Sequence, residues 1–123
     1  MESEAVRLLR AEHGDTWPDQ VLAPLEAAAG RLATATQAES AHAEFHRLVV
    51  ASAGSTRITE AYAGLDAEML LFLRQLRFHY DAAALCTEHT AYLREIQRTG
   101  EQAVRSHLDH STTMLLAARN AVS

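Results

Sequence analysis

Apolar positions recur in steps of three and four along most of the chain, the spacing that places side chains on one face of an α-helix. Residues 56–79 show it best, with a 4-3-4-3-4 spacing through the following positions: Ile58, Tyr62, Leu65, Met69, Phe72 and Leu76. Gly14, Gly54 and Gly100 separate consecutive stretches, and glycine is typical of helix ends. The pattern predicts six helices, over residues 2–13, 18–35, 37–53, 56–79, 81–99 and 101–121.

These helices are joined by short turns, which favours an antiparallel bundle. Valine and isoleucine are too few and too scattered to build a sheet, and 123 residues suit a single domain over residues 1–123. Pro24 is the one conflict, because an interior proline loses a hydrogen bond and clashes with the preceding turn. We therefore expect the second helix to begin near Val21 or to kink at Pro24. The predicted fold class is all-α.

Charge and composition exclude several function classes. The chain has 11 Lys and Arg against 16 Asp and Glu, a formal net charge of -5, and no basic cluster. Direct nucleic-acid contact is not expected, because phosphate binding usually requires a basic face. The apolar runs are too short to span a membrane. The single cysteine, Cys86, excludes an internal disulfide and fits a cytoplasmic location.

Seven histidines are the most distinctive feature of the composition. His42 and His46 are four residues apart, so they share one helix face and can chelate one ion. His89 lies within the apolar stripe of residues 81–99, and His107 and His110 lie on the apolar stripe of residues 101–121. Five histidines are therefore expected to point inward.

The last two helices should form a hairpin about Gly100. His89 lies eleven residues before this glycine and His110 ten after it, which predicts a similar depth for both rings. His107 would lie about one turn nearer the loop. The predicted metal ligands are His42, His46, His89 and His110, with His107 as the competitor for the last place.

Imidazole binds zinc, nickel, copper and iron, and one divalent ion, zinc or nickel, is the expected cofactor. The alternative is that each histidine merely bonds a nearby carbonyl or carboxylate at the edge of the core. Four converging imidazoles favour the metal, because burying them unpaired costs stability that an ion would restore.

Several short motifs carry a family resemblance across essentially the whole chain. They are Glu2-Ser3-Glu4-Ala5 with Leu8, His42-Ala43-Glu44-Phe45-His46 with Ala51-Ser52-Ala53-Gly54-Ser55, Glu88-His89 with Tyr92, Leu93 and Ile96, and Gly100-Glu101 with Ala103 and His110. This pattern resembles that of FCD domains, the C-terminal effector-binding domains of GntR-type transcription regulators of the FadR subfamily.

The resemblance implies a dimeric helical bundle that holds a divalent metal with an aspartate and three histidines. It further implies a small carboxylate-bearing metabolite beside the metal, and winged-helix domains that bind DNA. His46, His89 and His110 match the family histidines, although His107-Leu108 fits the last motif literally. His42 stands where the family has its aspartate, a change that favours a softer metal. Ser55 stands where the family has an asparagine.

The chain starts at what resembles the first helix of that domain, so we expect either a fragment of a regulator or a stand-alone sensor-like domain. We therefore expect a ligand-sensing, homodimeric domain that contacts DNA only through a winged-helix domain outside this chain. A carboxylate effector would use the metal and a nearby cation or hydroxyl. The candidate effector contacts are Arg74, Arg77, Tyr62 and Tyr92. The alternative is that the arginines face solvent and that the tyrosines pack in the core.

Two other functions compete with this one. A histidine-rich bundle of the hemerythrin-like or di-iron kind needs several inward carboxylates, usually in Glu-x-x-His pairs. The chain offers one such pair, Glu39 with His42. A metal-free helical interaction domain is the other alternative. Catalysis is not expected, because no nucleophile–base pair is apparent.

Overall fold

The computed structural model describes residues 2–63 and 81–122, and these residues are almost entirely helical. Residues 56–63 form a helical segment that begins after Gly54. The other helices are α1 (Glu2–His13), α2 (Asp19–Arg31), α3 (Ala38–Ser52), α5 (Ala82–Thr99) and α6 (Glu101–Val122). No strand occurs among the described residues. The predicted all-α fold is confirmed.

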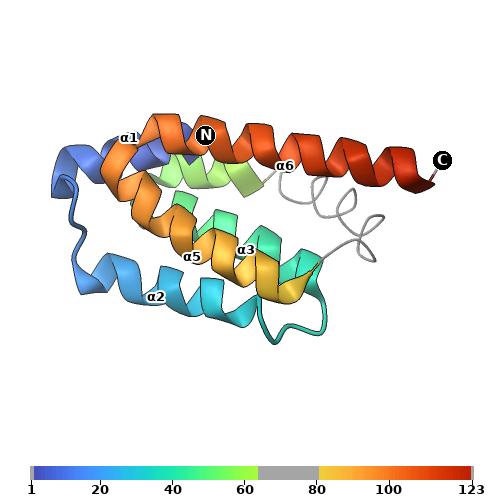
Figure 1. The fold of residues 1–123 in the computed structure, drawn as a ribbon. Helices are drawn as coiled ribbons and strands as arrows, with labels where there is room; N and C mark the ends of the chain where they lie inside the picture. The colour runs from blue at the N-terminus through green and yellow to red at the C-terminus, as the bar shows by residue number, and fades with distance from the viewer. Residues whose placement is uncertain (1, 64–80, 123) are drawn as a thin grey trace.

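The helices pack as a bundle in which α3 and α5 lie between α2 on one side and α1 and α6 on the other (Figure 1). α1 contacts α3, α5 and α6, while α2 contacts α3 and α5 from the opposite edge. α5 and α6 also contact each other, as the predicted hairpin requires. This arrangement brings α1, α3, α5 and α6 together in one region of the bundle.

The α5–α6 hairpin is defined by both ends of α5. The Asp81 carboxylate caps the start of α5 by accepting a hydrogen bond from the backbone N–H of Ala84 at 3.1 Å. Gly100 follows the last residue of α5 with a φ of 62°, and α6 begins at the next residue. Arg10 donates to the carbonyls of Gln97 and Arg98 at 3.2 and 3.3 Å, which satisfies two carbonyls at the end of the helix.

The second helix begins close to its predicted start but ends before its predicted end. It begins at Asp19 rather than near Val21, and Pro24 lies inside it. A proline at this position costs one backbone hydrogen bond, which the packing of α2 against α3 and α5 offsets. The helix stops at Arg31, and the backbone then tightens into turns in which Leu32 and Ala33 donate to carbonyls three residues back.

A continuous apolar core lies between the helices. Its largest fully buried members are Trp17, Phe45, Leu9, Leu25, Leu32 and Ile96. Trp17 comes from the connection between α1 and α2, and its indole N–H donates to the carbonyl of Gly14 at 3.1 Å. The hydrophobic effect acting on these side chains fixes the relative positions of α1, α2, α3 and α5.

Among the described helices, none is both long enough and apolar enough to cross a bilayer.

Candidate metal centre

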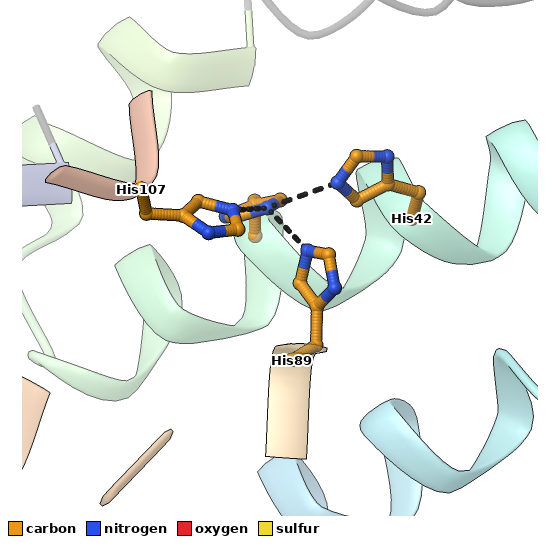
Figure 2. Close-up of side chains that lie close together, drawn as sticks. His42, His89 and His107 are labelled. Carbon is orange, nitrogen blue, oxygen red and sulfur yellow. Dashed lines mark hydrogen bonds between the residues drawn. The ribbon is translucent and has the colours of Figure 1, made fainter. Parts of the chain in front are cut away.

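Four histidines from three helices converge on one point. α3 contributes His42 and His46, α5 contributes His89, and α6 contributes His107. One ring nitrogen from each lies within 4.8 Å of the others. Figure 2 shows the rings of His42, His89 and His107 pointing toward a common centre, where dashed lines mark their contacts with His46.

The ring nitrogens closest to His46 lie at distances typical of ligands of a single ion. His46 Nε2 lies 3.2 Å from the Nε2 atoms of both His42 and His89, and 3.3 Å from that of His107. Imidazole nitrogens bound about 2.0–2.1 Å from one zinc ion in a tetrahedral arrangement are about 3.3–3.4 Å apart. The three distances from His46 match this spacing, and all four ring nitrogens lie within 4.8 Å of one another, so the donor set suits one metal ion.

The outer nitrogens of three rings lie near oxygen atoms, and two of them form hydrogen bonds. His46 Nδ1 lies 2.8 Å from Glu2 Oε1, and His89 Nδ1 lies 2.8 Å from the Leu85 carbonyl oxygen. His107 Nδ1 lies 3.5 Å from a carboxylate oxygen of Glu88. A carbonyl can only accept, so Nδ1 of His89 must donate, and in the neutral ring its Nε2 then carries a lone pair. A neutral His46 likewise carries its proton on Nδ1, because the Glu2 carboxylate can only accept.

The histidines are largely removed from water. His89 is fully buried, and the His107 side chain is 10% exposed. Burial, followed by the charges of the neighbouring histidines, lowers the pKa of His89 to about 3 and that of His107 to about 4. The same causes hold the pKa of His42 well below its usual value. These three rings are neutral at pH 7, the form that binds metals.

Glu2 and Tyr92 stand behind the cluster. The Tyr92 hydroxyl donates to the Glu2 carboxylate, and the Tyr92 ring stacks on His107 with centroids 4.2 Å apart. Burial tends to raise the pKa of Glu2, but the charge of His46 and hydrogen bonds from His46 and Tyr92 together lower it. Burial and the Glu2 charge raise the pKa of Tyr92. Glu2 is therefore a carboxylate and Tyr92 a neutral donor.

The structure places His107, and not His110, with the other three histidines. The His110 side chain is 57% exposed, and its Nε2 lies 3.7 Å from Glu88. Distance from Gly100 measures depth along the hairpin but not direction around the helix axis. Residues three apart on a helix point about 60° apart, which is enough to separate an inward from an outward side chain.

The predicted effector contacts are only partly within the described residues. Tyr92 lies at the cluster, and the charge of Tyr62 contributes to the raised pKa of Tyr92. Tyr62 is half-buried in the helical segment 56–63. Arg74 and Arg77 lie outside the described residues.

A groove of about 380 Å³ runs along the α5–α6 hairpin. Its lining includes Tyr92 and His107 from the cluster, together with Glu88, Arg98 and His110. A volume of this size is at the lower end of the range for small-molecule sites. The groove therefore offers space for a small ligand beside two of the residues of the centre.

Glu2 was not identified as a site residue from the sequence. An acidic residue in the first turn of a helix is expected simply because it favours the helix dipole. Glu4, in the same turn, is in fact exposed and pairs with Arg7. Nothing in the local pattern distinguishes the two glutamates, since only the packing of α1 against α3 and α5 brings Glu2 to His46.

Comparison with known proteins identifies the family of this chain. Residues 1–112 match the FCD domain family. No curated protein and no solved structure matches the chain. The family match covers most of the 123 residues and includes all four clustered histidines. The chain belongs to the FCD domain family, the ligand-sensing domains of GntR-type transcription regulators.

Proposed function

We propose that this FCD domain senses a small carboxylate-bearing metabolite through one divalent metal ion held by four histidines. The family supplies the ligand-sensing role in transcription regulation. The metal and the carboxylate are what the family resemblance implies, and the histidine cluster supports both. The proposed ligands are His42, His46, His89 and His107.

The observation that carries the proposal is the approach of two hydrogen-bond acceptors. In their neutral forms His46 and His89 both direct a lone pair from Nε2 toward the centre, and these atoms are 3.2 Å apart. Two lone pairs at this distance repel each other unless a cation or a proton lies between them. A metal ion at the centre would accept both lone pairs at once.

Charge balance supports an anionic ligand. Four neutral imidazoles leave the two positive charges of a divalent ion uncompensated, and Glu2 is a single buried carboxylate. Glu88 is more exposed and lies at a longer distance, so it compensates less. A buried net charge is costly unless it is paired. A carboxylate bound to the metal removes the remaining charge.

The donor set supports zinc or nickel. Imidazole nitrogens bind both ions, whereas calcium and magnesium require oxygen ligands. A carboxylate oxygen of the effector would add to the four protein nitrogens as a fifth ligand, a coordination number that zinc can adopt. His42 provides a neutral donor, which leaves the centre more positive than a set that includes a carboxylate. That extra charge strengthens the attraction for the metabolite.

A di-iron or hemerythrin-like centre is less well supported. Glu39 is buried on α3, three residues before His42, but the candidate group among the described residues contains only histidines. One ion per chain is therefore proposed. The family role is regulatory, and we propose a homodimer that reaches DNA only through a winged-helix domain.

Metal analysis of metal-depleted protein after addition of Zn²⁺ or Ni²⁺ tests the proposal. We expect one ion per chain and a higher melting temperature, because an ion bound only to the folded state stabilises it. His46→Ala and His89→Ala should lose both effects. His13→Ala, at the end of α1, is the matched control and should behave as the parent. Unchanged binding in the first two variants would overturn the proposal, and two ions per chain would favour the di-iron alternative.

A further inference from the structure

We infer that Glu2 is a positioning residue of the metal centre: its carboxylate orients His46 toward the ion and supplies buried negative charge that strengthens binding. This inference rests on the proposed metal site. Glu2 does not touch the ion in this arrangement. It acts through His46.

Both carboxylate oxygens of Glu2 have partners at the centre. Oε1 accepts from His46 Nδ1 at 2.8 Å, and Oε2 accepts from the Tyr92 hydroxyl. The partners lie on α3 and α5, 44 and 90 residues away in the sequence. The Glu2 side chain is 14% exposed and that of His46 is 17% exposed, so water screens the pair weakly. The carboxylate is thus fixed in place by two helices.

This arrangement determines which nitrogen of His46 faces the ion. A carboxylate cannot donate, so the neutral ring carries its proton on Nδ1 and presents the Nε2 lone pair to the centre. A carboxylate accepting from the outer nitrogen also makes the inner nitrogen a better donor to a metal. Loss of such a partner typically weakens metal binding about 10–100-fold.

Tyr92 has a supporting role. Its hydroxyl holds the second oxygen of Glu2, and its ring stacks on His107, with an interplanar angle of 29°. One side chain therefore contacts both the positioning carboxylate and a candidate ligand. Removing the hydroxyl should loosen Glu2 without removing its charge, so the effect should be smaller than that of changing Glu2.

Glu4 provides an internal control. It has the same side chain in the same helical turn, but it is exposed and pairs with Arg7. If Glu2 merely stabilised the first turn of α1, Glu2→Gln and Glu4→Gln should have similar effects. If Glu2 acts through His46, only Glu2→Gln should alter metal binding.

Zinc affinity, measured by competition with a chromophoric chelator, tests the inference. We expect Glu2→Gln to bind Zn²⁺ about tenfold more weakly than wild type, and Glu2→Leu, which also removes the acceptor, up to about 100-fold more weakly. Tyr92→Phe should lose a few-fold, and Glu4→Gln should stay within about twofold of wild type. Thermal melts of the metal-free variants check that each is folded.

Nitrogen-15 chemical shifts of the histidine rings provide a readout that a purely structural role would not change. In Glu2→Leu, metal-free His46 should shift toward the tautomer protonated on Nε2, while His89, held by Leu85, should keep its Nδ1 proton. Zinc binding by Glu2→Gln and Glu2→Leu within twofold of Glu4→Gln would overturn the inference and leave the metal site intact. Failure of the wild type to bind zinc would overturn both.

Discussion

The apolar core and the histidine cluster are both buried, yet they differ in whether the protein alone satisfies their buried groups. The core around Trp17 and Leu25 consists of side chains that gain simply by leaving water. The cluster gathers ring nitrogens whose lone pairs, in the proposed metal site, are satisfied by a cation. The core therefore accounts for the stability of the domain, and we propose that the cluster accounts for its response to a ligand.

Helix α3 takes part in both regions. Phe45 and Val49 are fully buried in the core, while His42 and His46 face the cluster. The Phe45 ring lies 5.2 Å from the His46 ring and 5.0 Å from the His89 ring, between centroids. A rigid apolar contact thus holds the two ligand helices in register. The core positions the site but contributes no ligand to it.

The largest expected effect comes from the core. Trp17 is 2% exposed, and truncating a large buried aromatic residue usually costs about 3–5 kcal/mol. Trp17→Ala should lower the unfolding free energy of the metal-free protein by about that amount in urea titrations. Zinc affinity under native conditions should change by less than about threefold, because Trp17 contacts none of the four histidines through a hydrogen bond or a ring contact. A loss of zinc affinity comparable to the loss of stability would show that the two regions are not separable.

A pair of histidine variants tests the cluster through zinc affinity rather than through stability. His107→Ala removes a ligand from the cluster and should weaken zinc binding by about 100-fold or more, which corresponds to about 2.7 kcal/mol. His110→Ala removes an exposed side chain and should stay within about threefold of wild type. Chelator competition compares them directly. The opposite ranking would show that the α6 ligand is His110.

The cluster should also make the metal-free protein sensitive to acid. An unfolded histidine has a pKa of about 6.5, whereas the folded values are about 3 for His89 and about 4 for His107. At pH values between the folded and the unfolded pKa, the unfolded chain binds more protons than the folded one. The free energy of unfolding therefore falls as the pH drops from 6.5 to 4. Each such histidine contributes a slope of about 1.4 kcal/mol per pH unit.

Urea unfolding with a chelator present, at several pH values in this window, measures the slope. His107→Phe, which removes one of these groups and keeps an aromatic ring, should reduce it. Trp17→Ala should lower stability equally at each pH. A flat profile for the wild type would mean that the cluster remains protonated in the folded state.

The helices were predictable from the sequence because their apolar spacing is a local property that the buried faces satisfy. Trp17 was not identifiable as a core residue, because a single residue in a connection has no periodic neighbours that would reveal its direction. Glu2 could not be distinguished from Glu4 for a similar reason. Both depend on contacts between helices that are distant in the sequence.

The candidate site was predictable in its main features but not in its last member. His42 and His46 share a face by spacing alone, and His89 lies on an apolar stripe. The choice between His107 and His110 depends on how α6 is rotated about its axis as it leaves Gly100. The turn and the packing of α6 set that rotation. Counting residues from Gly100 reveals neither of them.

The smallest expected effect concerns this turn. Gly100 has a φ of 62°, and a Cβ built there would lie 2.8 Å from the Arg10 side chain. Gly100→Ala should therefore cost about 1–2 kcal/mol of stability, from backbone strain and displacement of Arg10. Gly30→Ala, inside α2 where a Cβ meets nothing within 4 Å, is the control and should stabilise the protein by up to about 1 kcal/mol. Urea unfolding with and without zinc shows whether this turn matters to the site. If the core alone maintains the placement of α5 against α6, Gly100→Ala should lower the free energy of unfolding by the same amount in both conditions. A larger loss in the zinc-loaded protein would mean that the turn itself sets the distance between His89 and His107, which would make the hairpin part of the metal centre.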